Sequence, residues 1–154
     1  MTMVPRRSLS TLRSGAAAVE CAITLPVVMF VLFAMLDLGL ATIRYNALAA
    51  AARCIAREAI LHGSLAPAAT GSWGVNEFIG TGADGAPMTT SLAGILPTME
   101  AEDVGVRITW PDGGNSPRSR VQVELTYHHD SVAPGLASRG PIVLRAATTM
   151  HIVN

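Results

Sequence analysis

The sequence contains few of the residues that mark nucleic-acid-binding proteins, disulfide-rich proteins and cysteine metal sites. It has no lysine, and its 11 arginines are balanced by 11 acidic residues, so the formal net charge is zero. A chain without excess positive charge has no basic field that could hold nucleic acid. Its two cysteines, Cys21 and Cys54, are too few for a disulfide scaffold and form no CxxC pair. We therefore expect no nucleic-acid partner and no cysteine-based metal site.

Aromatic residues make up only 5% of the chain and charged residues 14%, whereas half of the 154 residues are apolar. The mean hydropathy of +0.40 is high for a soluble protein, and the excess is concentrated in one run. From Cys21 to Ile43 the single charged residue is Asp37, and Pro26 lies early in the run. A helix needs about 20 residues to cross about 30 Å of hydrocarbon, so this run is long enough to span a membrane.

Two other interpretations of this run stay open. A signal peptide would have Arg6, Arg7 and Arg13 as its basic region and Ala47–Ala49 as its small-residue cleavage site. Glu20 at the head of the run argues against it, and so does the length of the run, which exceeds an ordinary signal peptide core. A buried core helix is disfavoured because the rest of the chain has few large apolar residues to surround it. A membrane span is the favoured interpretation.

The orientation of such a span does not follow from charge alone. Three arginines precede the run and three follow it closely: Arg6, Arg7, Arg13, Arg44, Arg53 and Arg57. Counting positive charge on the two sides therefore gives a tie. The short N-terminal tail and the long C-terminal remainder favour a cytoplasmic N-terminus with the rest of the chain outside.

An acidic residue stands where the apolar run begins. Gly15 and Ala16 precede Glu20 in the sequence GAAAVE, after a short basic leader. A charge at the head of a spanning helix is costly to bury and needs a partner. Cleavage after Gly15 would create one, because the new α-amino group of Ala16 lies four residues before Glu20 in the same helix. In a packed array, Glu20 could equally face the amine of a neighbouring copy.

This head resembles the processing site of type IV prepilins, which a membrane aspartic peptidase cuts after the glycine. Over about residues 14–62 the sequence is similar to the N-terminus of the TadE-like minor pilins, or pseudopilins, of tight-adherence (Flp, type IVb) pilus systems. The features that carry the resemblance are the GAAAVE head, Leu25-Pro26, Asp37 with Gly39, and an alanine-rich helix with arginine. The tail from Val121 to Asn154 also has the family's appearance. Cys21 and Leu40 depart from its usual pattern.

The resemblance implies a structural component of pilus assembly and not an enzyme. Its implied partners are the membrane bilayer, the prepilin peptidase, other pilins or pseudopilins, and the assembly platform with its ATPase. It would lie in the bacterial cytoplasmic (inner) membrane, with the N-terminus cytoplasmic and the C-terminal domain outside, or enter the pilus. The alternatives are a secreted binding domain released after Ala49 and an unprocessed, membrane-tethered envelope protein. No cofactor and no small-molecule substrate are expected.

Helical periodicity continues beyond the apolar run, so one helix is predicted over residues 16–62. Its apolar stripe is predicted to consist of Ile43, Ala47, Ala50, Cys54 and Leu61. Residues 63–103 are rich in glycine, alanine and proline, with short helices predicted near 73–79 and 87–96.

The pattern then changes to strict alternation, which is typical of strands. Residues 104–110 and 121–127 alternate apolar and polar side chains around a turn at 111–115, so they predict an antiparallel hairpin. A third strand is predicted within 142–153, after a Pro134-Gly135 loop. The expected fold class is α+β: a long N-terminal transmembrane helix extends into the outer compartment, and a small three-stranded antiparallel sheet packs on its distal half. The predicted division is leader 1–15, helix 16–62, linking segment 63–103 and sheet 104–154.

No catalytic or metal-ligating motif is recognised. The four histidines, at positions 62, 128, 129 and 151, form no spaced ligand set, and His128 with His129 is expected at an exposed strand end. Asp37 is interpreted as an interfacial residue, with a contact to a partner pilin or the assembly platform as the alternative. Cys21 and Cys54 are too far apart along one helix to pair and are interpreted as small packing residues; the alternative for Cys54 is an intermolecular disulfide.

Overall fold

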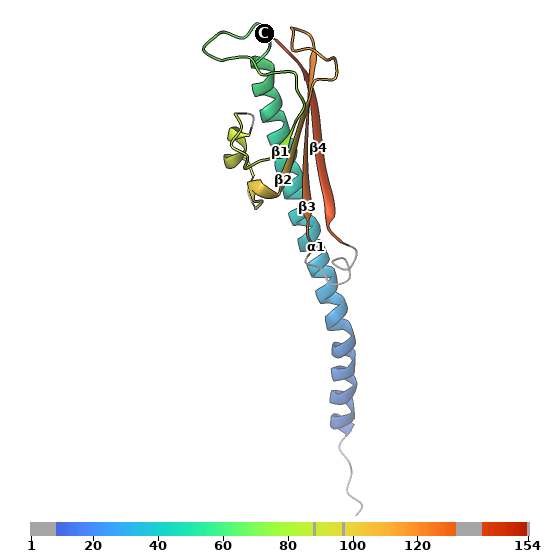
Figure 1. Cartoon of the computed structure of the whole chain (residues 1–154). Coiled ribbons are helices and arrows are strands. Elements are labelled where there is room, and N and C mark those ends of the chain that lie inside the picture. Colours follow the sequence, from blue (N-terminus) through green and yellow to red (C-terminus); the bar gives the residue numbers. More distant parts are fainter. Residues whose placement is uncertain (1–8, 88, 97, 132–139, 154) are drawn as a thin grey trace, which may run out of the picture.

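A long helix carries a small sheet along its C-terminal half (Figure 1). The computed structural model describes residues 9–87, 89–96, 98–131 and 140–153, without the side chains of 9–14, 91 and 93. The predicted α+β class, with a long apolar N-terminal helix and an antiparallel sheet, is confirmed. The Pro134-Gly135 loop lies outside the described residues, and the division of the chain into four segments stays a prediction.

The helix, α1, runs without interruption from Leu9 to Leu61 and includes Pro26. Its 53 residues correspond to about 80 Å at 1.5 Å per residue. It begins upstream of the predicted start at Ala16. Within the described part of the chain, the segment Gly15–Leu61 is the one helix long and apolar enough to cross a membrane, and its most apolar window has no buried residue.

The sheet has four strands: β1 (Phe78–Thr81), β2 (Val104–Thr109), β3 (Arg120–His129) and β4 (Ile142–His151). They lie in sequence order, and each pairs antiparallel with the next. The predicted hairpin is confirmed as β2 and β3, and the third predicted strand is confirmed as β4. Two short 3-10 helices, η1 (Thr90–Gly94) and η2 (Ala101–Asp103), lie between β1 and β2.

The expectation of three strands is wrong, because β1 forms inside the stretch where a helix was predicted near residues 73–79. This strand is only four residues long and contains Gly80, so it has too little alternation to be recognised. It is held by pairing to β2, with Phe78 opposite Ile108. A side chain at Gly80 would displace the Asp84 carboxylate, which accepts hydrogen bonds from Thr81. In the second predicted helix only η1 forms.

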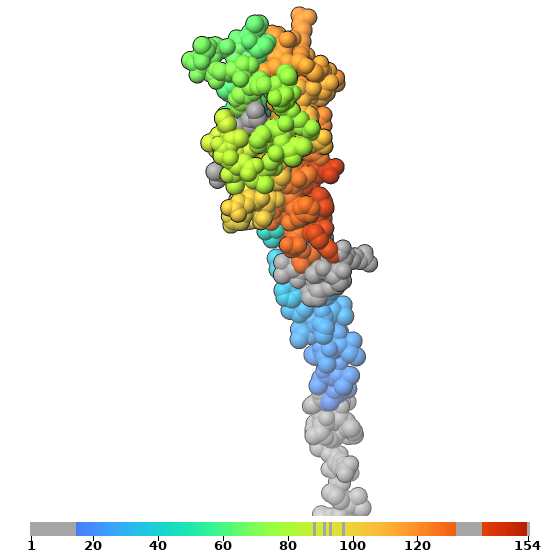
Figure 2. Space-filling model, viewed as in Figure 1, coloured from blue at the N-terminus to red at the C-terminus, as the bar shows by residue number. Residues whose placement is uncertain are grey.

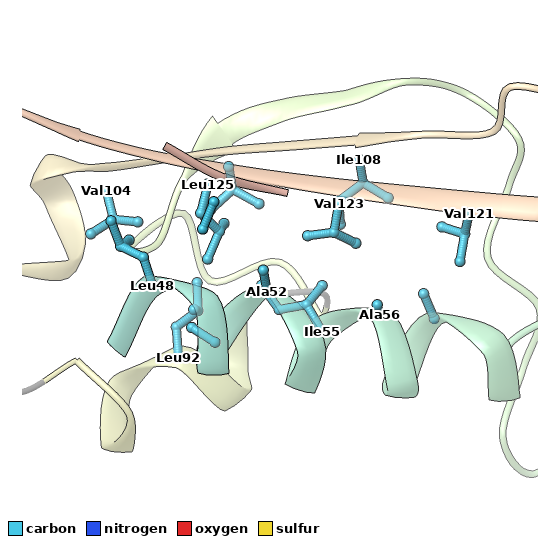
Figure 3. Packing of buried hydrophobic residues seen from close by; sticks show 14 of the residues in the cluster. Leu48, Ala52, Ile55, Ala56, Leu92, Val104, Ile108, Val121, Val123 and Leu125 are labelled. Atoms are coloured by element: carbon cyan, nitrogen blue, oxygen red, sulfur yellow. The ribbon is translucent and has the colours of Figure 1, made fainter. Parts of the chain in front are cut away.

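The core lies between α1 and the inner face of the sheet. Figure 3 shows one face of α1 turned toward β2 and β3, with Leu92 of η1 closing the side. The helix contributes mainly alanines and two large residues seven positions apart, and the strands contribute alternate residues. The buried residues in this view include Leu48, Ala52, Ile55, Ala56, Val104, Ile108, Val121, Val123 and Leu125.

The predicted stripe on the helix was displaced by about one residue. Ile43, Ala50 and Leu61 are exposed, whereas Leu48 and Ile55 are fully buried. The displacement arose because alanines occupy every face of this part of the helix, so they do not indicate which face is covered. The two large side chains mark the buried face correctly.

Candidate functional site

The predicted processing residues lie on the exposed, unpacked part of α1. Gly15, Ala16 and Glu20 all have exposed side-chain positions. A Cβ atom built on Gly15 would meet no atom within 4 Å, so packing within this chain does not require glycine there.

The leader arginines contribute little to the described structure. Arg6 and Arg7 lie outside the described residues, and only the backbone of Arg13 is described. The backbone carbonyl of Glu20 accepts a hydrogen bond from the Thr24 hydroxyl at 2.9 Å. Among the described residues, the Glu20 carboxylate has no ion-pair partner. The roles of Gly15, Ala16 and Glu20 in processing stay predictions.

The lower part of the predicted span is apolar on every side. All described side chains from Gly15 to Phe33 are exposed, and most of the larger ones are valine, leucine, isoleucine, methionine or phenylalanine. Figure 2 shows this part of the helix extending below the rest of the molecule. An apolar surface of this extent requires lipid or other apolar surfaces around it.

The character of the helix changes at Asp37, whose side chain is turned toward the sheet. Asp37 is only 3% exposed. Its Oδ2 accepts a hydrogen bond from the Ser131 hydroxyl at 2.6 Å, and its Oδ1 lies 3.4 Å from Nε2 of His129, the last residue of β3. The sheet therefore supplies polar partners for the one acidic residue in the predicted span.

His129 also contacts Arg44, two turns further along α1. Nη1 of Arg44 lies 2.6 Å from Nδ1 of His129, and its guanidinium lies 5.2 Å from the centre of the Tyr127 ring. Because an arginine N–H can only donate, Nδ1 is the acceptor, and the ring proton is on Nε2, facing Asp37. The 3.4 Å separation there is long for a hydrogen bond, and Nε2 has no hydrogen-bond acceptor among the described residues.

We call Asp37, Arg44, Tyr127, His129 and Ser131 the junction cluster. The imidazole of His129 stands between the carboxylate of Asp37 and the guanidinium of Arg44, so groups of opposite charge flank it on its two sides. Charge compensation of this kind is what allows ionised groups to be buried.

The expectation of an exposed strand end at His128 and His129 was wrong for His129. His128 is exposed, but His129 is fully buried. The alternation of β3 already indicated that His129 is buried. Every second residue from Val121 to Tyr127 faces the core, and His129 is the next residue in this series. Asp37 is buried within the chain, and its interpretation as a residue near the outer end of the span stays a prediction.

The cysteines and the other histidines form no group that indicates a site among the described residues. Cys21 is exposed and Cys54 half-buried; both are free thiols. The His62 ring stacks on Trp73 at 4.3 Å, and its Nδ1 donates to the carbonyl of Gly71. His151 is exposed. Across the described ranges, no three histidine, cysteine or acidic side chains are grouped so that they could hold a metal ion.

Comparison with protein-family models gives a match over part of α1. The model of the TadE-like protein family matches residues 15–57, which is the family that the sequence resembles. The match starts at Gly15 and includes Glu20, the apolar run and Asp37. The comparisons with curated proteins and with solved structures gave no match.

Proposed function

We propose that this chain is a TadE-like minor pilin or pseudopilin, a membrane-anchored structural component in the assembly of a tight-adherence (Flp) type IV pilus. The observation that carries the proposal is the family match over residues 15–57. It begins at the predicted cleavage glycine and covers the whole apolar run. The exposed, mainly apolar surface of α1 from Cys21 to Phe33 supports a membrane anchor.

In this proposal a prepilin peptidase cleaves after Gly15. Removal of the leader takes away Arg6, Arg7 and Arg13, which leaves 8 arginines against 11 acids and a formal charge of about −3. The new amine of Ala16 then partners Glu20, either within one helix or between neighbouring copies. The absence of any packing contact at Gly15 agrees with a residue selected by the peptidase.

The chain would lie in the cytoplasmic membrane with its N-terminus inside and the sheet, packed on the distal half of α1, outside. It would be the substrate of the peptidase and cargo of the assembly platform, and not itself a catalyst. Covered residues begin at Ala34 on the helix, which supports a division between a membrane part and an outer part.

The alternative of a secreted domain released after Ala49 is disfavoured by the packing. Cleavage there would remove Leu48, which is fully buried in the core. It would also remove Asp37 and Arg44, and leave His129 buried without either charged partner. A domain designed for release at this point would be expected to keep its core intact.

The role of Glu20 provides a direct test in a strain with an active pilus system. Glu20→Ala should still be processed, because the glycine is intact, but should fail to co-purify with sheared pili or with cross-linked partner pilins. Glu20→Asp retains the charge and is the matched control, which should assemble. Normal incorporation of Glu20→Ala would refute the proposed role of this carboxylate.

A further inference from the structure

We propose that the outer domain rests directly on the membrane, with the lower end of the sheet forming a lipid-contact surface level with Asp37. This inference rests on the proposed membrane anchor. It locates the outer edge of the bilayer on α1 and identifies β4 as a second element that contacts the lipid. The lipid-contact surface consists of Leu36 and Leu38 of α1 and Ile142 and Val143 of β4. Its partner is the outer leaflet of the bilayer, at the boundary between acyl chains and headgroups.

The length of α1 limits where the outer edge of the hydrocarbon can lie. If hydrocarbon extended from Cys21 to Ile43, its outer edge would lie six residues past Asp37, or about 9 Å along the helix. The ends of β3 and β4 would then be immersed in lipid, and unpaired backbone groups at an open sheet edge are not tolerated there. Residues 16–36 alone span about 31 Å, which matches a hydrocarbon core of about 30 Å.

The first residues of β4 lie beside the junction cluster. Ile142 is paired with His129 across the β3–β4 ladder, and His129 contacts both Asp37 and Arg44. The first residues of β4 are therefore at the level where α1 leaves the predicted bilayer. Figure 1 shows the same arrangement, with the lower end of the sheet beside the middle of the helix.

The four apolar side chains of the lipid-contact surface are exposed. Leu36 is 70% exposed, Leu38 58%, Ile142 37% and Val143 52%. Large apolar side chains on two different elements thus remain uncovered near the level of the junction cluster, and those of α1 continue the apolar surface of the span. Asp37 is turned away from them toward Ser131 and His129, and the exposed acid at this end of the sheet is Asp130, which follows β3.

The surface chemistry changes along β4. Two residues beyond Val143 on the same face, Arg145 forms an ion pair with Glu124 at 3.0 Å. Further along this face are Thr149 and His151, both exposed. Since two strand residues cover about 7 Å, the surface changes from apolar to charged over the thickness of a headgroup layer.

The test measures depth in the full-length protein, in vesicles of phosphatidylcholine and phosphatidylglycerol. In a background with Cys21→Ser and Cys54→Ser, single cysteines are introduced as Phe30→Cys, Leu38→Cys, Val143→Cys and Thr149→Cys and labelled with bimane. Quenching is compared for lipids brominated near the headgroup and near the chain end. Thr149 is the matched control, six residues along the same strand face, about 20 Å from Val143.

We expect the label at position 30 to lose fluorescence most with deep bromines, and labels at 38 and 143 to lose it most with shallow bromines. The label at 149 should keep its fluorescence with both. Quenching at 30 without quenching at 38 and 143 would overturn this inference and leave the anchor intact. No quenching at 30 would refute the membrane anchor itself. Equal quenching at 143 and 149 would also overturn the inference, because the sheet would then lie along the membrane.

Discussion

At the level of single residues, the junction cluster explains how a carboxylate is accommodated at the end of an apolar helix. Asp37 is buried against the end of β3, and the imidazole of His129 lies between its carboxylate and the guanidinium of Arg44. Ser131 donates a further hydrogen bond from the segment after β3. The cluster thereby ties the end of β3 to two positions on α1 that lie two turns apart.

Replacing His129 by leucine should therefore destabilise the protein, although leucine fills a similar volume. The buried Asp37 and the half-buried Arg44 would lose the group between them, and a buried polar group left without its partner costs about 1–3 kcal/mol. His128→Leu is the matched control, because this neighbour is exposed and should change stability by less than about 0.5 kcal/mol. Thermal unfolding followed by circular dichroism in detergent measures both; equal melting temperatures would contradict the role of the cluster.

A second residue-scale prediction concerns the loop between β2 and β3. Arg120 donates from its side chain and its backbone N–H to Asp112, and these bonds lower the pKa of that carboxyl from 3.8 to about 2. Because the folded-state pKa is lowered, the stabilisation is present above about pH 4 and is lost as the pH falls through about 2.

This shift can be measured by an NMR titration of ¹³C-labelled aspartate in the full-length protein in micelles. Arg120→Gln should raise the pKa of Asp112 toward its ordinary value, because the charged side-chain donor is removed. Arg118→Gln changes an exposed arginine two residues away and should leave the titration unchanged. An Asp112 carboxyl that titrates identically in Arg120→Gln and in the parent protein would refute the assigned cause.

At the level of elements, the alanines of α1 allow the sheet to approach closely. Ala51, Ala52 and Ala56 are almost fully buried, and branched side chains of the sheet lie opposite Ala52 and Ala56 (Figure 3). A small residue at each of these positions leaves room for a valine or isoleucine from the strand, and packed interiors have little spare volume.

Enlarging one of these alanines should therefore be costly. Ala52→Leu is expected to lower the free energy of unfolding by about 1–3 kcal/mol, the usual effect of overpacking a core. Ala50→Leu places the same side chain on the exposed face of the same helix and should be nearly neutral. Chemical denaturation of the two variants side by side checks this, and a neutral Ala52→Leu would show that the helix and sheet are not closely packed.

The elements differ in how far they could be predicted from the sequence. The β2–β3 hairpin and β4 were predictable because each has enough alternating residues to define a face. The four-residue strand β1 was not, because its position depends on pairing with β2 and on the Asp84 turn. The junction cluster required long-range information, since Asp37 and His129 are far apart in sequence, although the parity of β3 already placed His129 inside.

At the level of the whole molecule, polar contacts hold the sheet to the helix near both ends of the sheet. The junction cluster fastens its lower end, and Asn115 fastens the upper end by donating to the backbone carbonyls of His62 and Trp73. Between them lies the apolar core. The outer part of the molecule should therefore follow the tilt of the span as one body.

The proposed processing site also concerns the molecule as a whole, because its cleavage and later pairing involve other molecules. Gly15 and Glu20 were recognised from their spacing and from the apolar run that follows, and the fold places no packing demand on either position. Their significance is in cleavage by a peptidase and in pairing after cleavage.

The central claim is tested most directly by the N-terminal sequence of the mature protein. The chain is co-expressed with its prepilin peptidase, purified from membranes and sequenced. The account predicts a mature chain that begins at Ala16, and no cleavage when Gly15 is replaced by valine. A mature chain that begins near Ala50, an intact Met1, or unaltered cleavage of Gly15→Val would contradict it.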